Sequence, residues 1–169
     1  DRRYIFLEYF ILQPGVFWDS ILDILEEKAA HGVEVRLIYD DMGCIFSLPR
    51  DYNEQLAARG IQCRVFNRFV PVMSLRLNNR DHRKLMIIDG KVGFTGGINL
   101  ADEYINQRER FGHWKDTGIR LDGPGAWGLT RRFIHMWEMR GNRMPNEHDY
   151  YRPLEERAAE GFCQPFTDG

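Results

Sequence analysis

One short stretch of this sequence combines the side chains that attack on a phosphodiester requires. His82 and Lys84 are two residues apart in a run of β-forming residues. Successive side chains on a strand alternate between its two faces, so His82 and Lys84 should point the same way. An imidazole can form a covalent bond to phosphorus while a neighbouring ammonium group holds the anionic oxygens. The pair therefore predicts nucleophilic phosphodiester chemistry.

The residues that follow this pair extend the candidate site. Asp89 lies an odd number of residues after His82, so in a regular strand it faces away, and we expect a structural anchor rather than a base. Gly96 and Gly97 permit a close backbone approach, and Asn99 can then donate its side-chain amide to the same phosphate. An exposed polar strand edge is the alternative interpretation of the His-x-Lys spacing. The Asp and the Gly-Gly-x-Asn at their fixed distances disfavour that alternative.

Other ionisable residues have ordinary structural interpretations. His113 could line a substrate cleft, although a histidine beside Trp114 is more often packed on the ring. Asp40 and Asp41, at the end of a predicted strand, would suit a metal ion. Because no further acidic residues lie nearby in sequence, a solvated loop is favoured, and we expect no metal site.

The charge balance argues against a nucleic-acid-binding protein. With 23 Lys and Arg against 25 Asp and Glu, the formal net charge is −2, whereas proteins that bind nucleic-acid backbones usually carry a basic excess. No run approaches the roughly 18 uninterrupted apolar residues of a membrane span. The sequence begins with Asp1 rather than methionine and enters a strand-like run almost at once, so we interpret it as part of a longer protein.

Hydrophobic periodicity predicts the elements that hold the candidate residues in place. We expect strands at 4–12, 33–40, 61–65, 82–89, 92–95 and 117–121, and helices at 17–29, 49–60, 101–105 and 124–139. Gly90-Lys91 should form the two-residue turn between two of these strands. Two successive strand–helix–strand units at the start favour an α/β layer structure with parallel pairing.

An irregular apolar stretch, 69–77, comes shortly before the strand that carries His82. Its apolar side chains could meet acyl chains or the surface of a bilayer. The alternative is that the stretch packs under a second half of the parent protein. The sequence leaves both interpretations open.

The whole pattern resembles a known family. The spacing HxKxxxxD followed by GGxN resembles the motif of the phospholipase D superfamily, and the stretches 78–84, 93–104 and 112–117 are similar to the first catalytic half of bacterial cardiolipin synthases. The resemblance covers 4–165 and implies one catalytic domain at 1–169. The implied fold is a phospholipase D-like α/β/α sandwich, in which helices flank a mixed, largely parallel sheet.

The resemblance also implies roles for individual residues. His82 would be the nucleophile that forms a phosphatidyl-histidine intermediate, and Lys84 and Asn99 would hold the phosphate. Asp116 is similar to the acidic residue that orients a motif histidine, with the histidine of the opposite half as a candidate. The alternative is that Asp116 is only a turn residue before a strand. Enzymes of this family need no metal or cofactor, so none is expected here.

The implied function is a phosphatidyltransferase that makes cardiolipin from two molecules of phosphatidylglycerol. A phosphodiesterase or nuclease that uses water as acceptor is the alternative, as is a half-site that is inactive alone. The family carries two motif copies and this chain has one, so a second catalytic half in the parent chain or a homodimer partner is expected. We expect the parent protein at the bacterial inner membrane and this part of it to be soluble at the membrane surface.

Overall fold

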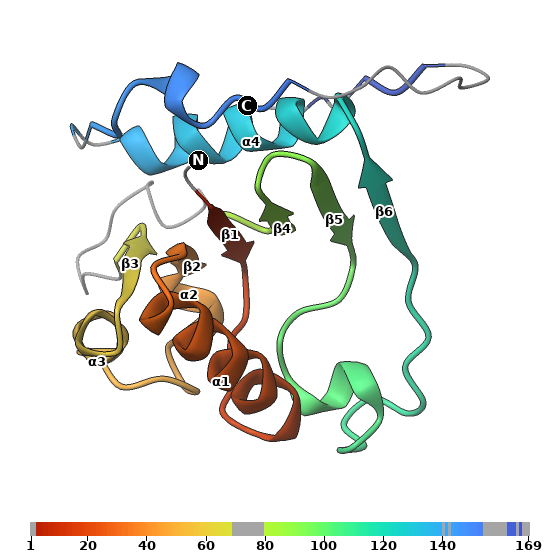
Figure 1. Cartoon of the computed structure of the whole chain (residues 1–169). Coiled ribbons are helices and arrows are strands. Elements are labelled where there is room, and N and C mark those ends of the chain that lie inside the picture. Colours follow the sequence, from red (N-terminus) through yellow and green to blue (C-terminus); the bar gives the residue numbers. More distant parts are fainter. Residues whose placement is uncertain are drawn as a thin grey trace.

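The computed structural model describes residues 3–68, 80–139, 141, 143–153, 162–164 and 166. Its centre is a six-stranded sheet in the order β3-β2-β1-β4-β5-β6, which helices cover on both faces (Figure 1). All the strands lie where the sequence predicts them, with only their ends shifted. They are β1 (Tyr4–Tyr9), β2 (Glu34–Asp40), β3 (Ile61–Phe66), β4 (Lys84–Ile88), β5 (Val92–Gly96) and β6 (Gly118–Asp122).

The helices of the described residues include all the predicted ones and two short ones that were not predicted. The predicted helices are α1 (Val16–Ala30), α3 (Tyr52–Ala58), the 3-10 helix η2 (Asp102–Ile105) and α4 (Gly125–Glu138). The two additional helices are α2 (Asp41–Cys44) and the 3-10 helix η3 (Glu147–Asp149). Each of these spans about one turn, which is too short to show a helical period in the sequence.

The sheet is mixed, as expected, but it is not largely parallel. β1 pairs with β2 and β2 with β3 in parallel. The remaining pairs, β1 with β4, β4 with β5 and β5 with β6, are antiparallel. The link between β4 and β5 is the three-residue turn Asp89-Gly90-Lys91, and so short a connection can only join antiparallel strands. The prediction of a largely parallel sheet extrapolated the strand–helix–strand start beyond β3, where the helical crossovers stop.

Two apolar cores lie on the two faces of the sheet. On one face, α1 buries Trp18 and Leu25 against β1 and β2. On the other face, α4 buries Phe133, whose ring stacks on Phe6 of β1 at a centroid distance of 4.5 Å. Truncating such a buried phenylalanine to alanine typically costs about 3–5 kcal/mol of stability. β1 and β4, at the middle of the sheet, are therefore held from both sides.

Two expectations concern the membrane. The apolar stretch 69–77 lies outside the described residues, so its proposed contact with lipid stays a prediction. None of the helices in the described ranges combines the length and the apolar character that crossing a bilayer takes.

Candidate active site

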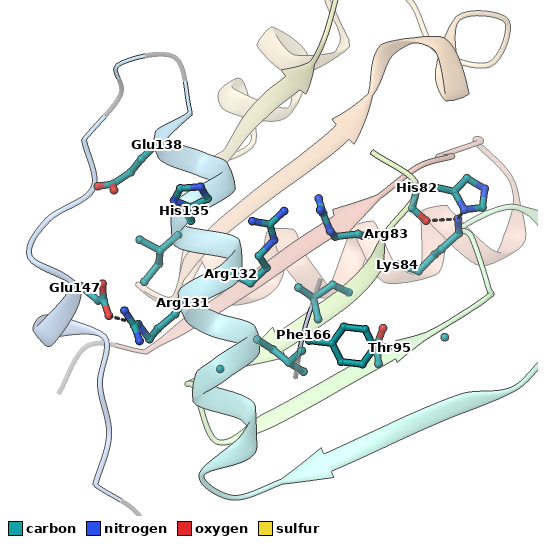
Figure 2. Close-up of a pocket in the computed structure, with 15 residues that line it drawn as sticks. His82, Arg83, Lys84, Thr95, Arg131, Arg132, His135, Glu138, Glu147 and Phe166 are labelled. Carbon is teal, nitrogen blue, oxygen red and sulfur yellow. Dashed lines mark hydrogen bonds and ion pairs between the residues drawn. The ribbon is translucent and has the colours of Figure 1, made fainter. Parts of the chain in front are cut away.

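His82 and Lys84 lie next to each other at the start of β4. The strand begins at Lys84 rather than at His82, yet the two side chains still meet. The Lys84 Nζ atom is 3.0 Å from His82 Nδ1 and donates to the His82 carbonyl oxygen at 2.5 Å (Figure 2). The imidazole is exposed, whereas Lys84 is only 5% exposed. A reachable ring thus stands beside an ammonium group that the fold holds in place.

Phe10, just after β1, forms an apolar wall for this pair. Its ring centroid is 4.8 Å from that of His82 and 5.4 Å from Lys84 Nζ. Burial lowers the pKa of Lys84 to about 8, although the negative charges of Asp81 and Asp116 oppose the shift. Burial, and then the charge of Lys84, lower the pKa of His82. At neutral pH the imidazole is therefore uncharged, which nucleophilic attack requires.

The contact between Lys84 and Nδ1 sets the tautomer of His82. When Lys84 is charged, its ammonium donates to Nδ1, and the ring proton resides on Nε2. For Nε2 to attack, the proton must be on Nδ1. A phosphate that draws the ammonium of Lys84 toward itself would release Nδ1 and permit this change.

Asp116 lies at the same place, next to Gly97. Its Oδ2 accepts from Trp114 Nε1 at 3.0 Å, and its Oδ1 accepts from the Thr117 backbone N–H at 2.7 Å. The Trp114 bond is the main cause that lowers the pKa of Asp116, and Lys84 adds to it. A Cβ atom at Gly97 would collide with this carboxylate. The structure therefore brings Asp116 and Gly97 together with Lys84.

Gly96 allows a close approach between two strands, whereas Gly97 leaves space for the Asp116 carboxylate. A Cβ atom there would lie 2.5 Å from the Thr117 carbonyl oxygen, so glycine lets the ends of β5 and β6 approach. The same approach delivers Asp116, which directly precedes Thr117, to Gly97. Gly96 thus contributes to the site by allowing the strands to close.

Asn99 is buried, and its amide group is largely engaged. Its Oδ1 accepts from the Ile11 backbone N–H at 3.0 Å, and its Nδ2 donates to the Tyr104 hydroxyl at 2.8 Å. One of the two Nδ2 hydrogens is used in this way, which leaves the other for a ligand. Asn99 fixes the chain after β1, next to Phe10. Its predicted role as a phosphate ligand stays a prediction.

Asp89 and His113 lie away from the reacting pair. Asp89 follows the far end of β4, in the turn to β5, where it has a positive φ of 53° and accepts from the Tyr4 backbone N–H at 2.8 Å. It joins the start of β1 to this turn. His113 is exposed in the loop between η2 and β6 and takes no part in the contacts around Lys84 described above.

The sequence predicted that Asp40 lies in a solvated loop, and this prediction is wrong. Its side chain is completely buried. Oδ1 accepts from the backbone N–H groups of Met42 and Gly43 at the start of α2, and Oδ2 accepts from that of Asp81 at 2.9 Å. The carboxylate is buried because three backbone donors satisfy it. Asp40 thereby fixes the residue that precedes His82.

A buried cluster of Glu8, Asp81 and Arg83 lies beneath the site, and sequence reasoning missed it. Arg83 Nη1 is 3.1 Å from Asp81 Oδ1 and 3.3 Å from Glu8 Oε1. Burial, and then the charge of Asp81, raise the pKa of Glu8 well above its usual range. The fold therefore favours the protonated form of Glu8. The one sign of this cluster in the sequence is that Glu8 interrupts the apolar run of β1.

Comparison with known proteins identifies the family of this chain. The sequence profile of the cardiolipin synthase, phospholipase D-like domain matches residues 3–117. The chain belongs to the cardiolipin synthase family of phospholipase D-like domains. This agrees with the resemblance seen around His82.

Individual relatives show how much of the family's length is present. A Streptococcus mutans protein of uncharacterized function is 46% identical over 167 residues, which are 99% of this chain and 36% of that protein. Cardiolipin synthase 2 of Staphylococcus epidermidis is 38% identical over 142 residues, or 84% of this chain and 29% of that one. The solved structure of Nuc from Salmonella typhimurium, a phospholipase D family member, has the same fold, with a TM-score of 0.58, 18% identity and coverage of 83% of this chain and 82% of Nuc. The chain spans about a third of the length of the curated relatives it matches.

A cavity opens beside His82 in this cardiolipin synthase-like domain. It has a volume of about 580 Å³ and lies between the start of β4, the end of β5 and α4 (Figure 2). Its wall contains Lys84 and the guanidinium groups of Arg83, Arg131 and Arg132, which outnumber the carboxylates of Glu138 and Glu147. Anions are therefore the ligands that this cavity favours.

A second, apolar groove of about 410 Å³ begins at the same point. It is lined by Phe17 of α1, Met86 of β4, Phe94 of β5 and Ile98, among others. Both spaces have Lys84, Thr95 and Gly96 in their walls. An anion-binding space and an apolar space thus converge on the predicted reaction centre.

Within the described ranges, no group of three or more His, Cys, Asp or Glu side chains could hold a metal ion.

Proposed function

We propose that this domain is the first catalytic half of a phosphatidyltransferase that makes cardiolipin from two molecules of phosphatidylglycerol. The observation that carries the proposal is the contact between His82 and Lys84 at the point where the cationic cavity and the apolar groove converge. A phospholipid has one anionic and one apolar part, and this arrangement suits both. The names of the curated relatives point the same way.

The reaction has two displacement steps at phosphorus. His82 Nε2 forms a P–N bond to phosphatidylglycerol while the P–O bond to the glycerol headgroup breaks, and the departing oxygen takes up a proton. A hydroxyl of a second phosphatidylglycerol then attacks phosphorus, its proton passes to a base, and the P–N bond breaks. Two phosphatidylglycerol molecules thus give one cardiolipin and one glycerol. Lys84 would hold the anionic oxygens throughout both steps.

The acid and base in these steps would come from a second motif copy. A lysine follows two residues after both His82 and His113, but only His82 is also followed by the Asp and the Gly-Gly-x-Asn of the motif. The second copy would lie in another part of the parent chain or in a homodimer partner. Asp116 would orient the motif histidine of that copy, a role that its electrostatic interaction with Lys84 supports.

The test is product formation by the full-length protein. Supplied with phosphatidylglycerol vesicles, it should release glycerol and cardiolipin in equal amounts, and the His82→Asn variant should lose both. The matched control is His31→Asn, because His31 lies at the C-terminal end of α1, away from the site. Phosphatidic acid in place of cardiolipin would show that water is the acceptor and support the phosphodiesterase alternative. A folded wild type without any turnover would refute both.

A further inference from the structure

The cationic cavity contains a positive charge that the two-step reaction has not used. Arg132 of α4 lies beside Arg83, as the lowering of the Arg132 pKa by burial and then by the charge of Arg83 shows. In Figure 2 both guanidinium groups project into the same space, between His135 and the pair of His82 and Lys84. Two like charges held together in a cavity wall require an anion to offset them.

The neighbouring carboxylates do not supply this anion in full. Both Asp81 and Glu8 contact Arg83, at 3.1 and 3.3 Å, and on the pKa of Arg132 their opposing effect is smaller than that of burial and of the Arg83 charge. The Nε atom of Arg132 is buried and has no hydrogen-bond partner within the described ranges. An unsatisfied buried donor on a charged group is costly, so its place in the wall calls for a ligand.

Two other charged groups of this wall are already engaged. Arg131, the next residue of α4, forms an ion pair with Glu147 of η3 at 2.7 Å (Figure 2). Glu138 accepts from the Met144 backbone N–H at 3.0 Å. Arg132 is therefore the guanidinium of α4 that is available to an incoming anion.

The chemistry of the proposed reaction supplies a second anion. Lys84 holds the phosphate of the donor lipid, but the acceptor phosphatidylglycerol brings its own phosphate, three carbons from the attacking hydroxyl. Both phosphates must enter the same cavity, where they repel each other in a medium of low dielectric constant. A separate cation is needed for the acceptor.

We propose that Arg132, with Arg83 beside it, binds the phosphate of the acceptor phospholipid and so selects phosphorylated alcohols as acceptors. The inference rests on the proposed function. It assigns to α4 a role in choosing the second substrate, while the start of β4 handles the first.

The test compares two acceptors for the same phosphatidyl-histidine intermediate, phosphatidylglycerol and free glycerol. Radiolabelled glycerol, which carries no phosphate, can also attack the phosphatidyl-histidine intermediate. This reverse of the first step forms labelled phosphatidylglycerol. In the full-length protein, Arg132→Gln should slow cardiolipin formation by about tenfold or more, because a charge-assisted contact is lost. Glycerol exchange should change by less than about twofold, since one uncharged acceptor needs no cation. The control Arg59→Gln should leave both rates unchanged, because Arg59 follows α3 and pairs with Glu26 at 2.7 Å, outside the cavity.

A second measurement needs no variant and remains valid if Arg132→Gln fails to fold. Offered equal concentrations of glycerol and sn-glycerol 3-phosphate, the wild type should transfer phosphatidyl groups mainly to the phosphorylated alcohol. Equal use of the two, or a parallel loss of both rates in Arg132→Gln, would overturn the inference. Glycerol exchange without any cardiolipin would refute the proposed function alone. The preference between the two small acceptors, compared between the wild type and Arg132→Gln, would still decide the role of Arg132.

Discussion

At the scale of single residues, the state of His82 depends on Lys84. An ammonium group 3.0 Å from Nδ1 disfavours a second positive charge on the ring, and burial acts in the same direction. Lys84 itself gives up its proton more easily than a free lysine, because it is buried. Both groups therefore change charge within reach of physiological pH.

The pH profile of the full-length enzyme should report these two groups. His82 must be neutral to attack, and its lowered pKa places the acid limb of kcat/KM below the ordinary histidine value of 6.5. Lys84 must be charged to hold phosphate, so the alkaline limb should lie near pH 8. Bound phosphate raises the pKa of Lys84, so the alkaline limb of kcat should lie higher.

The variant Lys84→Arg is the control for this assignment. Its guanidinium stays charged throughout the accessible range, so whatever activity remains should lack the limb near pH 8. An alkaline limb that stays in place in Lys84→Arg would show that another group causes it.

At the scale of elements, the loop between η2 and β6 matters because it returns Asp116 to the end of β5. The approach depends on glycine at Gly97, where a side chain would occupy the position of the carboxylate. We expect Gly97→Ala to displace Asp116 and to lower kcat/KM by about tenfold to a hundredfold, as small misplacements of catalytic groups do. The melting temperature should change little, because Gly97 is exposed.

Gly118→Ala is the matched control at the same edge of the sheet. The nearest atom to its added Cβ would be the Thr95 carbonyl oxygen at 3.9 Å, an ordinary contact. Activity measured at equal folded fractions should therefore distinguish the two alanines. If both variants lose activity equally, the placement of Asp116 does not explain the effect.

The elements themselves were largely predictable, because their periodicity is local. The strand at β4 and the spacing of His82 and Lys84 were enough to indicate that the two side chains meet. What could not be predicted depends on contacts distant in sequence, such as Asp40 with Asp81 and Glu8 with Arg83. A lone buried carboxylate in an apolar strand looks like an interruption until the fold supplies its partner.

At the scale of the whole molecule, the site joins the two faces of the sheet. The cationic cavity lies on the α4 side and the apolar groove on the α1 side, and both reach Lys84. Since a phospholipid must leave the bilayer in part to react, a groove that accepts its acyl region offsets the cost of exposing it to water. We therefore expect the groove to contribute to the affinity for long-chain lipids.

Phe94→Asn tests that contribution. Phe94 lines the groove and is 36% exposed, so its replacement should not unfold the domain. Losing about half of a phenylalanine contact, roughly 1–2 kcal/mol, should raise KM for long-chain phosphatidylglycerol about tenfold. Turnover of a short-chain, soluble phosphatidylglycerol should stay unchanged.

The control for Phe94→Asn is Phe111→Asn. Phe111 is 73% exposed and lies in the loop between η2 and β6, outside the groove. A KM that rises equally for long-chain and short-chain lipids in Phe94→Asn would assign Phe94 to the headgroup rather than to the acyl chains.

The raised pKa of Glu8 couples folding to the binding of a proton. Between the ordinary and the raised pKa of Glu8, the folded chain binds a proton that the unfolded chain releases. Stability should therefore fall as pH rises through this range, and Glu8→Gln, which cannot titrate, should gain in relative melting temperature over the same range. The exposed Glu109→Gln should show no such trend. In isoelectric focusing across a urea gradient, the native chain should accordingly focus at a higher pH than its unfolded form, although the two have identical composition.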